Sequence, residues 1–89
     1  MHNTKIENSL LATHIANNPD FEKACKAGNK ELILSIVNFE MEKNNLHTKG
    51  SNKLRADIFR MVNSRKSTLE VLAFVWNSRL SGTGYAVIA

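Results

Sequence analysis

Cys25, the one cysteine of the chain, is the first candidate for a nucleophile. A thiol becomes reactive when a neighbouring base or cation lowers its pKa and generates the thiolate. His14 is the nearest histidine in sequence, but a predicted helix break separates it from Cys25, so the spacing does not bring the two side chains together. We therefore expect Cys25 to be buried as a small apolar residue.

The other residue types that do chemistry lack the spacing that chemistry requires. The histidines do not recur at the intervals by which zinc sites place their ligands. Glu40 and Glu42 point to different faces of one predicted helix. The glycine-rich run 81–84 follows a predicted helix and has no lysine, unlike a phosphate-binding loop. The sequence predicts no catalytic residue, no metal site, no cofactor and no small-molecule substrate, and we expect that the protein is not an enzyme.

Basic residues gather in the second half of the chain. Residues 1–48 carry five Lys and Arg against six Asp and Glu, whereas residues 49–89 carry seven against two. This asymmetry is typical of a protein that meets nucleic acid or an acidic partner, and a solvated face that keeps the protein soluble is the alternative. The segment that follows the basic run is apolar and unsuited to a groove, so phosphate contacts are expected rather than base contacts. The candidate residues are Lys49, Lys53, Arg55, Arg60, Arg65 and Lys66.

Capping signals predict the helices that would position these residues. Thr4–Glu7 and Ser67–Glu70 have the capping-box pattern, and Asn18 and Asn29 are N-cap residues. Gly28 suits the end of a helix. The signals predict helices over about 5–17, 19–27, 30–44, 53–63 and 68–80, with a flexible loop around 45–52 and a short extended apolar tail at 81–89. The predicted fold is one all-α domain over residues 1–89, a compact bundle of short helices.

Apolar periodicity assigns an inward face to each predicted helix. The residues expected to face the core are Ile6, Leu10 and Ile15 in the first helix, Leu32, Ile33, Ile36, Val37 and Phe39 in the third, Leu54, Ile58, Met61 and Val62 in the fourth, and Leu69, Leu72, Ala73, Trp76 and Leu80 in the fifth. Phe59 and Phe74 fall off these faces, and Tyr85 lies in the apolar tail. Such a surplus predicts an apolar docking surface at Phe59, Phe74 and Tyr85, or a set of helices that wrap one another and bury everything.

Length and composition limit the class of protein further. A chain of 89 residues with 43% apolar and 22% charged residues is a globular domain rather than a disordered segment. It has no apolar run of roughly 18 residues that could span a membrane. The polar start favours a cytoplasmic protein without a secretory leader. The abundance of Asn and Lys is typical of an AT-rich genome such as that of a phage or mobile element.

These observations leave two functions open. The first is a small non-enzymatic regulator or inhibitor that docks on a protein partner, either as a monomer or as a homodimer. The second is a basic nucleic-acid-binding accessory or regulatory protein that contacts phosphates through residues 49–66. Neither function involves a membrane.

Overall fold

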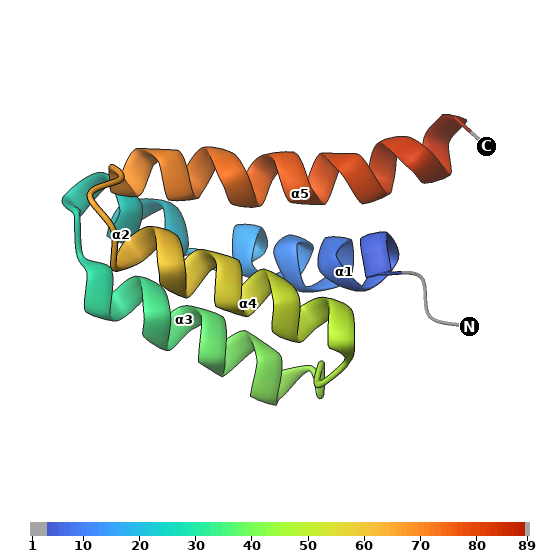
Figure 1. Cartoon of the computed structure of the whole chain (residues 1–89), viewed down its shortest axis with the longest axis horizontal. Helices are drawn as coiled ribbons and strands as arrows, with labels where there is room; N and C mark the ends of the chain where they lie inside the picture. The colour runs from blue at the N-terminus through green and yellow to red at the C-terminus, as the bar shows by residue number, and fades with distance from the viewer. Residues whose placement is uncertain (1–3, 89) are drawn as a thin grey trace.

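Helices make up all the regular structure that the chain shows between residues 4 and 88. The computed structural model describes the backbone of residues 4–88 and the side chains of residues 9–79. The helices, labelled in Figure 1, are α1 (Thr4–Asn17), α2 (Phe21–Ala27), α3 (Lys30–Lys43), α4 (Lys49–Val62) and α5 (Thr68–Ile88). Because residues 4–88 contain no strand, the predicted all-α bundle is confirmed.

The helix α1 packs against each of the other four helices, most extensively against α5. Figure 1 shows α1 and α5 side by side and antiparallel, while α3 and α4 form an antiparallel pair. Leu11, Ala12 and Ile15 of α1 are fully buried. Ser9 donates a hydrogen bond from Oγ to the carbonyl oxygen of Arg79 at 3.2 Å, so the backbone of α5 comes within reach of a short side chain on α1. The small residues of α1 therefore allow close packing of the two helices.

Several predicted helix boundaries are confirmed by their caps. Asn29 Oδ1 accepts a hydrogen bond from the Leu32 amide at 3.1 Å and opens α3. Gly28 closes α2 with a φ of 70°, a left-handed conformation that glycine adopts without a Cβ penalty. At the start of α5, Ser67 Oγ accepts from the Leu69 amide at 3.1 Å and Glu70 Oε2 accepts from the Ser67 amide at 3.3 Å. Each of these signals is local, which is why the sequence predicted them.

The start of α4 was predicted too late. The helix begins at Lys49 rather than near residue 53, so the predicted loop is reduced to residues 44–48. Thr48 is the N-cap, and its Oγ1 accepts a hydrogen bond from the Ser51 amide at 3.2 Å. A glycine in a helix costs only about 1 kcal/mol relative to alanine, and a good N-cap contributes a similar amount. The Gly- and Ser-rich composition of this segment therefore did not prevent a helical first turn.

The end of α5 was also predicted incorrectly, because the helix continues to Ile88 rather than ending near Leu80 with an extended tail. Residues 81–84 contain two glycines but no proline. Glycine weakens a helix without removing a hydrogen-bond donor, whereas proline removes one. The run was therefore insufficient to end the helix. The side chain of Tyr85, one of the predicted docking residues, lies outside the described side chains.

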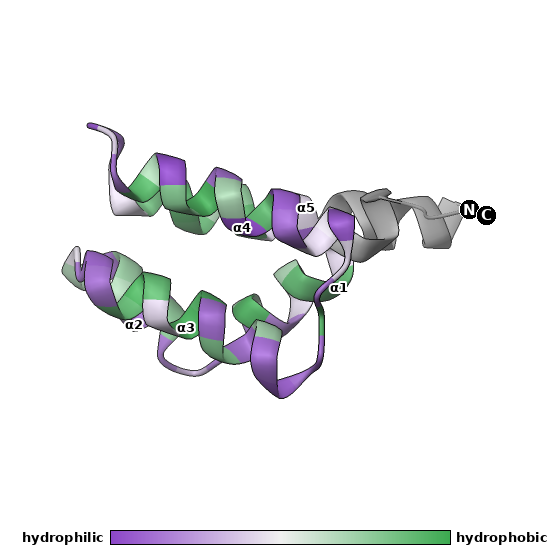
Figure 2. Cartoon of the chain, turned by 60° about the horizontal axis from the view of Figure 1, so that its bottom comes forward, coloured by the Kyte–Doolittle hydropathy of each residue, from purple (hydrophilic) through white to green (hydrophobic). Residues whose placement is uncertain are grey.

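The predicted inward faces were partly wrong. The large apolar side chains most exposed among residues 9–79 are all ones that periodicity placed inward: Leu10 at 48%, Leu32 at 38%, and Phe39 and Leu69 at 55%. Leu11, Met41 and Val75 are buried instead. Figure 2 shows green and purple bands alternating along the helices, as expected for helices with one inward side. The errors fall where apolar residues are adjacent, as at Leu10 and Leu11, so that periodicity alone does not choose between them.

Glu40 is a buried carboxylate that fixes the end of α3 to the turn between α1 and α2. Asn18 donates from Nδ2 to Glu40 Oε2 at 2.8 Å, and Asn44 donates from Nδ2 to Glu40 Oε1 at 3.0 Å. Asn18 Oδ1 also accepts from the Asp20 amide at 2.9 Å, so the same side chain shapes the turn before α2. A buried carboxylate satisfied by two amides is costly to disturb. Its removal leaves Asn18 Nδ2 without this acceptor, and Asn44 Nδ2 keeps only the Glu40 carbonyl oxygen, at 2.8 Å.

We expect replacement of Glu40 by alanine to lower the free energy of unfolding by about 1–3 kcal/mol, since both amide donors lose a charged acceptor. Urea denaturation followed by circular dichroism measures the change. Glu42→Ala is the matched control, because the Glu42 side chain is 76% exposed. The control should stay within about 0.5 kcal/mol of the parent chain. Equal effects of the two substitutions would contradict the structural role of Glu40.

Candidate interaction surfaces

Cys25 is fully buried in the core, as the sequence predicted. Burial raises the pKa of its thiol to about 11, with a smaller contribution from the negative charge of Glu22. Thr68 Oγ1 donates to the carbonyl oxygen of Cys25 at 2.5 Å, so the residue lies where α2 meets the start of α5. A buried thiol with a raised pKa stays protonated near neutral pH, which suits packing and not nucleophilic attack.

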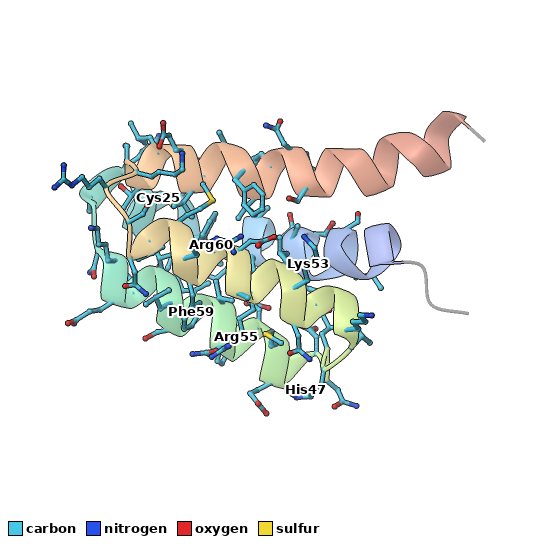
Figure 3. All side chains as sticks on the ribbon, in the orientation of Figure 1. Cys25, His47, Lys53, Arg55, Phe59 and Arg60 are labelled. Carbon is cyan, nitrogen blue, oxygen red and sulfur yellow. The ribbon has the colours of Figure 1, made fainter. Side chains whose placement is uncertain are left out.

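The basic residues of α4 divide between two sides of the helix. Lys49, Lys53 and Arg60 are exposed, whereas Arg55 is half-buried. In Figure 3, Lys53 and Arg60 lie along one side of α4, and Arg55 and Phe59 lie along the side toward α3. The six predicted basic residues therefore do not form one cluster.

Asp57 forms ion pairs with both Lys53 and Arg60. Lys53 Nζ lies 3.3 Å from Asp57 Oδ2, and Arg60 Nη2 donates to Asp57 Oδ1. The Asp57 side chain is 19% exposed, against 63% for Lys53 and 75% for Arg60, so the carboxylate lies beneath two longer and more accessible side chains. Sequence reasoning missed this group, although spacings of three and four residues are those at which helical side chains meet.

Arg55 connects α4 to α3 and to the predicted docking residue Phe59. Its Nε donates to Asn38 Oδ1 at 2.8 Å, and its guanidinium lies 4.2 Å from the centre of the Phe59 ring. Phe59 is partly buried and packs against the core. Arg55 therefore has two intramolecular partners, and a polyanion would have to compete with both of them.

Arg65 and Lys66 lie in the turn between α4 and α5, and both are exposed. The turn is held by Ser64, whose Oγ accepts from the Lys66 amide at 3.1 Å and donates to the Met61 carbonyl oxygen at 2.7 Å. Neither Arg65 nor Lys66 forms an ion pair with a side chain in residues 9–79. Their charges extend the exposed basic side of α4 past the end of the helix.

Neither of two cavities on the surface of the described region offers a uniform charge to a ligand. One of about 250 Å³ lies between α3 and α4 and has both Glu42 and Arg55 in its lining. The other, of about 320 Å³, lies beside α1 and α3 and has both Glu40 and Lys43 in its lining. No group of three His, Cys, Asp or Glu side chains in the described residues could hold a metal ion.

The helix α5 has apolar residues on two opposite sides. Val71 and Val75 are fully buried, and Phe74, a predicted docking residue, is partly buried and packs against the core. The other side, which we call the outer face of α5, consists of Leu69, Leu72, Ala73 and Trp76. Sequence reasoning assigned this set to the core, yet Leu69 is 55% exposed and Leu72 and Trp76 are only partly buried. Because the helix is apolar nearly all round, its pattern does not identify the covered side.

Comparisons with protein-family models, with curated proteins and with solved structures each find no significant match. None of the helices in the described part of the chain combines the length and the apolar run needed to cross a membrane.

We expect Cys25 to resist alkylation in the folded protein. A pKa raised from 9.0 to about 11 lowers the thiolate fraction near neutral pH about 100-fold, and burial blocks access as well. Iodoacetamide labelling at about pH 8 followed by mass spectrometry should modify the urea-unfolded chain at least about 100-fold faster than the folded chain. Rapid labelling of the folded chain would show that Cys25 is accessible and would reopen a catalytic or redox role.

Proposed function

We propose that this protein is a small non-enzymatic regulator that docks on a protein partner through the outer face of α5. The observation that carries the proposal is that the bundle covers only one side of a helix that is apolar on both. Val71 and Val75 are fully buried, while Leu69 on the opposite side is 55% exposed. Apolar side chains left at the surface of a small domain favour burial against another molecule.

The spacing on the outer face supports recognition of a helix. Leu69, Leu72 and Trp76 lie at i, i+3 and i+7, the positions by which an amphipathic helix enters an apolar groove. The exposed residues Leu10 and Phe39 lie on α1 and α3. Isolated apolar residues are ordinary on protein surfaces and need no partner, whereas a row along one helix forms a continuous contact.

Trp76 is suited to anchor such a contact. The Arg79 guanidinium lies 4.3 Å from the centre of the Trp76 ring, so an aromatic ring and a cation are held together beside the outer face. Tryptophan and arginine are among the residues most enriched where interfaces concentrate their binding free energy. A partner with an apolar groove and an acidic rim would satisfy both groups.

The arrangement of the outer face as a row along one helix favours a different protein over a second copy of this chain. The described part of the outer face offers four side chains, of which Leu72 already packs partly against the core. A row of apolar side chains along one helix suits a groove that encloses the helix better than a flat, self-complementary contact. We therefore expect the protein to be a monomer when purified alone.

The test is co-purification of the tagged chain from its native host at about 0.15 M salt, after nuclease treatment to remove partners held through nucleic acid. Leu69→Asp should lower recovery of a stoichiometric partner at least about 10-fold, because it places a charge in an apolar contact. Phe39→Asp is a matched control, since Phe39 and Leu69 are both 55% exposed. Equal recovery with both variants would contradict the proposal. A dimer of the parent chain that Leu69→Asp dissociates would instead assign the face to self-association.

A further inference from the structure

We propose that the exposed side of α4, together with the turn that follows it, binds the phosphate backbone of nucleic acid, and that Asp57 limits the affinity of this surface. We call this surface the basic side of α4. It consists of Lys49, Lys53, Arg60, Arg65 and Lys66. The inference goes beyond docking through α5, because it concerns a different helix and a different class of partner.

The basic residues follow one another along α4. Lys49, Lys53 and Arg60 are exposed and lie on the same side of the helix, opposite the buried residues Leu54 and Ile58. At 1.5 Å per residue, the distance along the axis from Lys49 to Arg60 is about 16 Å. Arg65 and Lys66 continue the charge beyond the helix. A row of this length meets several phosphates at once, since duplex DNA carries one negative charge per roughly 1.7 Å.

The neutral residues on the same side favour nucleic acid over a protein surface. Asn52, Ala56 and Asn63 lie among the basic residues and are exposed. None of them is a large apolar residue, whereas the centre of a protein interface is apolar and poor in charge. Asparagine amides donate hydrogen bonds to phosphate and sugar oxygens, as lysine and arginine do.

Asp57 is the acidic group that opposes phosphate binding on this surface. It pairs with Lys53 and with Arg60, which are two of the five basic residues. A phosphate that approaches these side chains must displace the carboxylate and also experiences its repulsion. Lys49, Arg65 and Lys66 form no ion pair with a side chain in residues 9–79, so they supply the first contacts. Removal of the Asp57 charge should therefore strengthen binding, a result that simple loss of structure would not produce.

The experiment is fluorescence anisotropy of the full chain with a labelled 20-base-pair DNA duplex and a single-stranded RNA of equal length, over a series of salt concentrations. Substitution of Lys49, Arg65 and Lys66 by alanine should weaken binding at least about 10-fold and reduce the slope of log K against log salt by about 2–3. The control substitutes Lys23, Lys26 and Lys30 on α2 and α3, which removes the same charge elsewhere. It should weaken binding less than about 3-fold. Equal losses in the two triple variants would overturn the assigned surface.

Asp57→Asn should tighten binding about 3- to 10-fold at about 0.1 M salt, because two cations are released toward phosphate. Glu31→Gln is the matched control for the change in net charge, since Glu31 is exposed on α3. If the Asp57→Asn variant binds no more tightly than the Glu31→Gln variant, Asp57 does not limit the affinity of the basic side of α4.

Absence of binding to both nucleic acids, or equal binding to poly-glutamate, would overturn nucleic acid as the partner. Leu69→Gln, which removes the apolar side chain without adding a charge beside Lys66, should leave the affinity for DNA and RNA unchanged within about 2-fold, so failure of this proposal can be told apart from failure of docking through α5.

Discussion

Packing around α1 is the constraint on which the rest of the bundle depends. All four other helices contact α1, and Leu11, Ala12 and Ile15 supply fully buried side chains to these contacts. Ser9 lets the backbone of α5 approach closely enough for a hydrogen bond to the Arg79 carbonyl oxygen. Because α1 contacts α5 from one side, the core receives Val71 and Val75, and the opposite side of α5 is left at the surface. The exposed apolar residues are thus a consequence of the packing order.

The sequence predicted the helices better than their orientations, and the reason is physical. Caps such as Asn29 and Gly28 act through the backbone of their own turn, so short-range signals suffice. Orientation depends on which neighbour a helix meets. Leu10 and Leu11 are equally apolar, but only the position of α1 among its neighbours decides that Leu11 is buried. The apolar pattern identified one side of α4 correctly, because its opposite side is polar.

The candidate surfaces were predictable to different degrees. Charge asymmetry predicted six basic residues, in α4 and in the turn that follows it, as contacts for a partner, and five of the six are exposed. It did not predict that Arg55 would donate to Asn38, since that contact joins residues on two helices. The burial of Glu40 was likewise hidden, because one of its two amide partners, Asn18, comes from the turn between α1 and α2, far from Glu40 in the sequence. Asp57 was within reach of sequence reasoning, through its helical spacing to Lys53 and Arg60.

The two surfaces differ in chemistry, and exposure to water therefore costs them different amounts of free energy. Water solvates the polar, basic side of α4 at little cost, so this side needs no partner to cover it. Exposure of the apolar outer face of α5 is unfavourable, and a partner that covers the face removes this cost. The two meet at one place, since Lys66 precedes Leu69 by less than one helical turn. A macromolecule held along α4 would therefore constrain what can approach Leu69. A partner with an acidic rim would compete with phosphate for Arg65 and Lys66, while a partner with a neutral rim would bind beside nucleic acid.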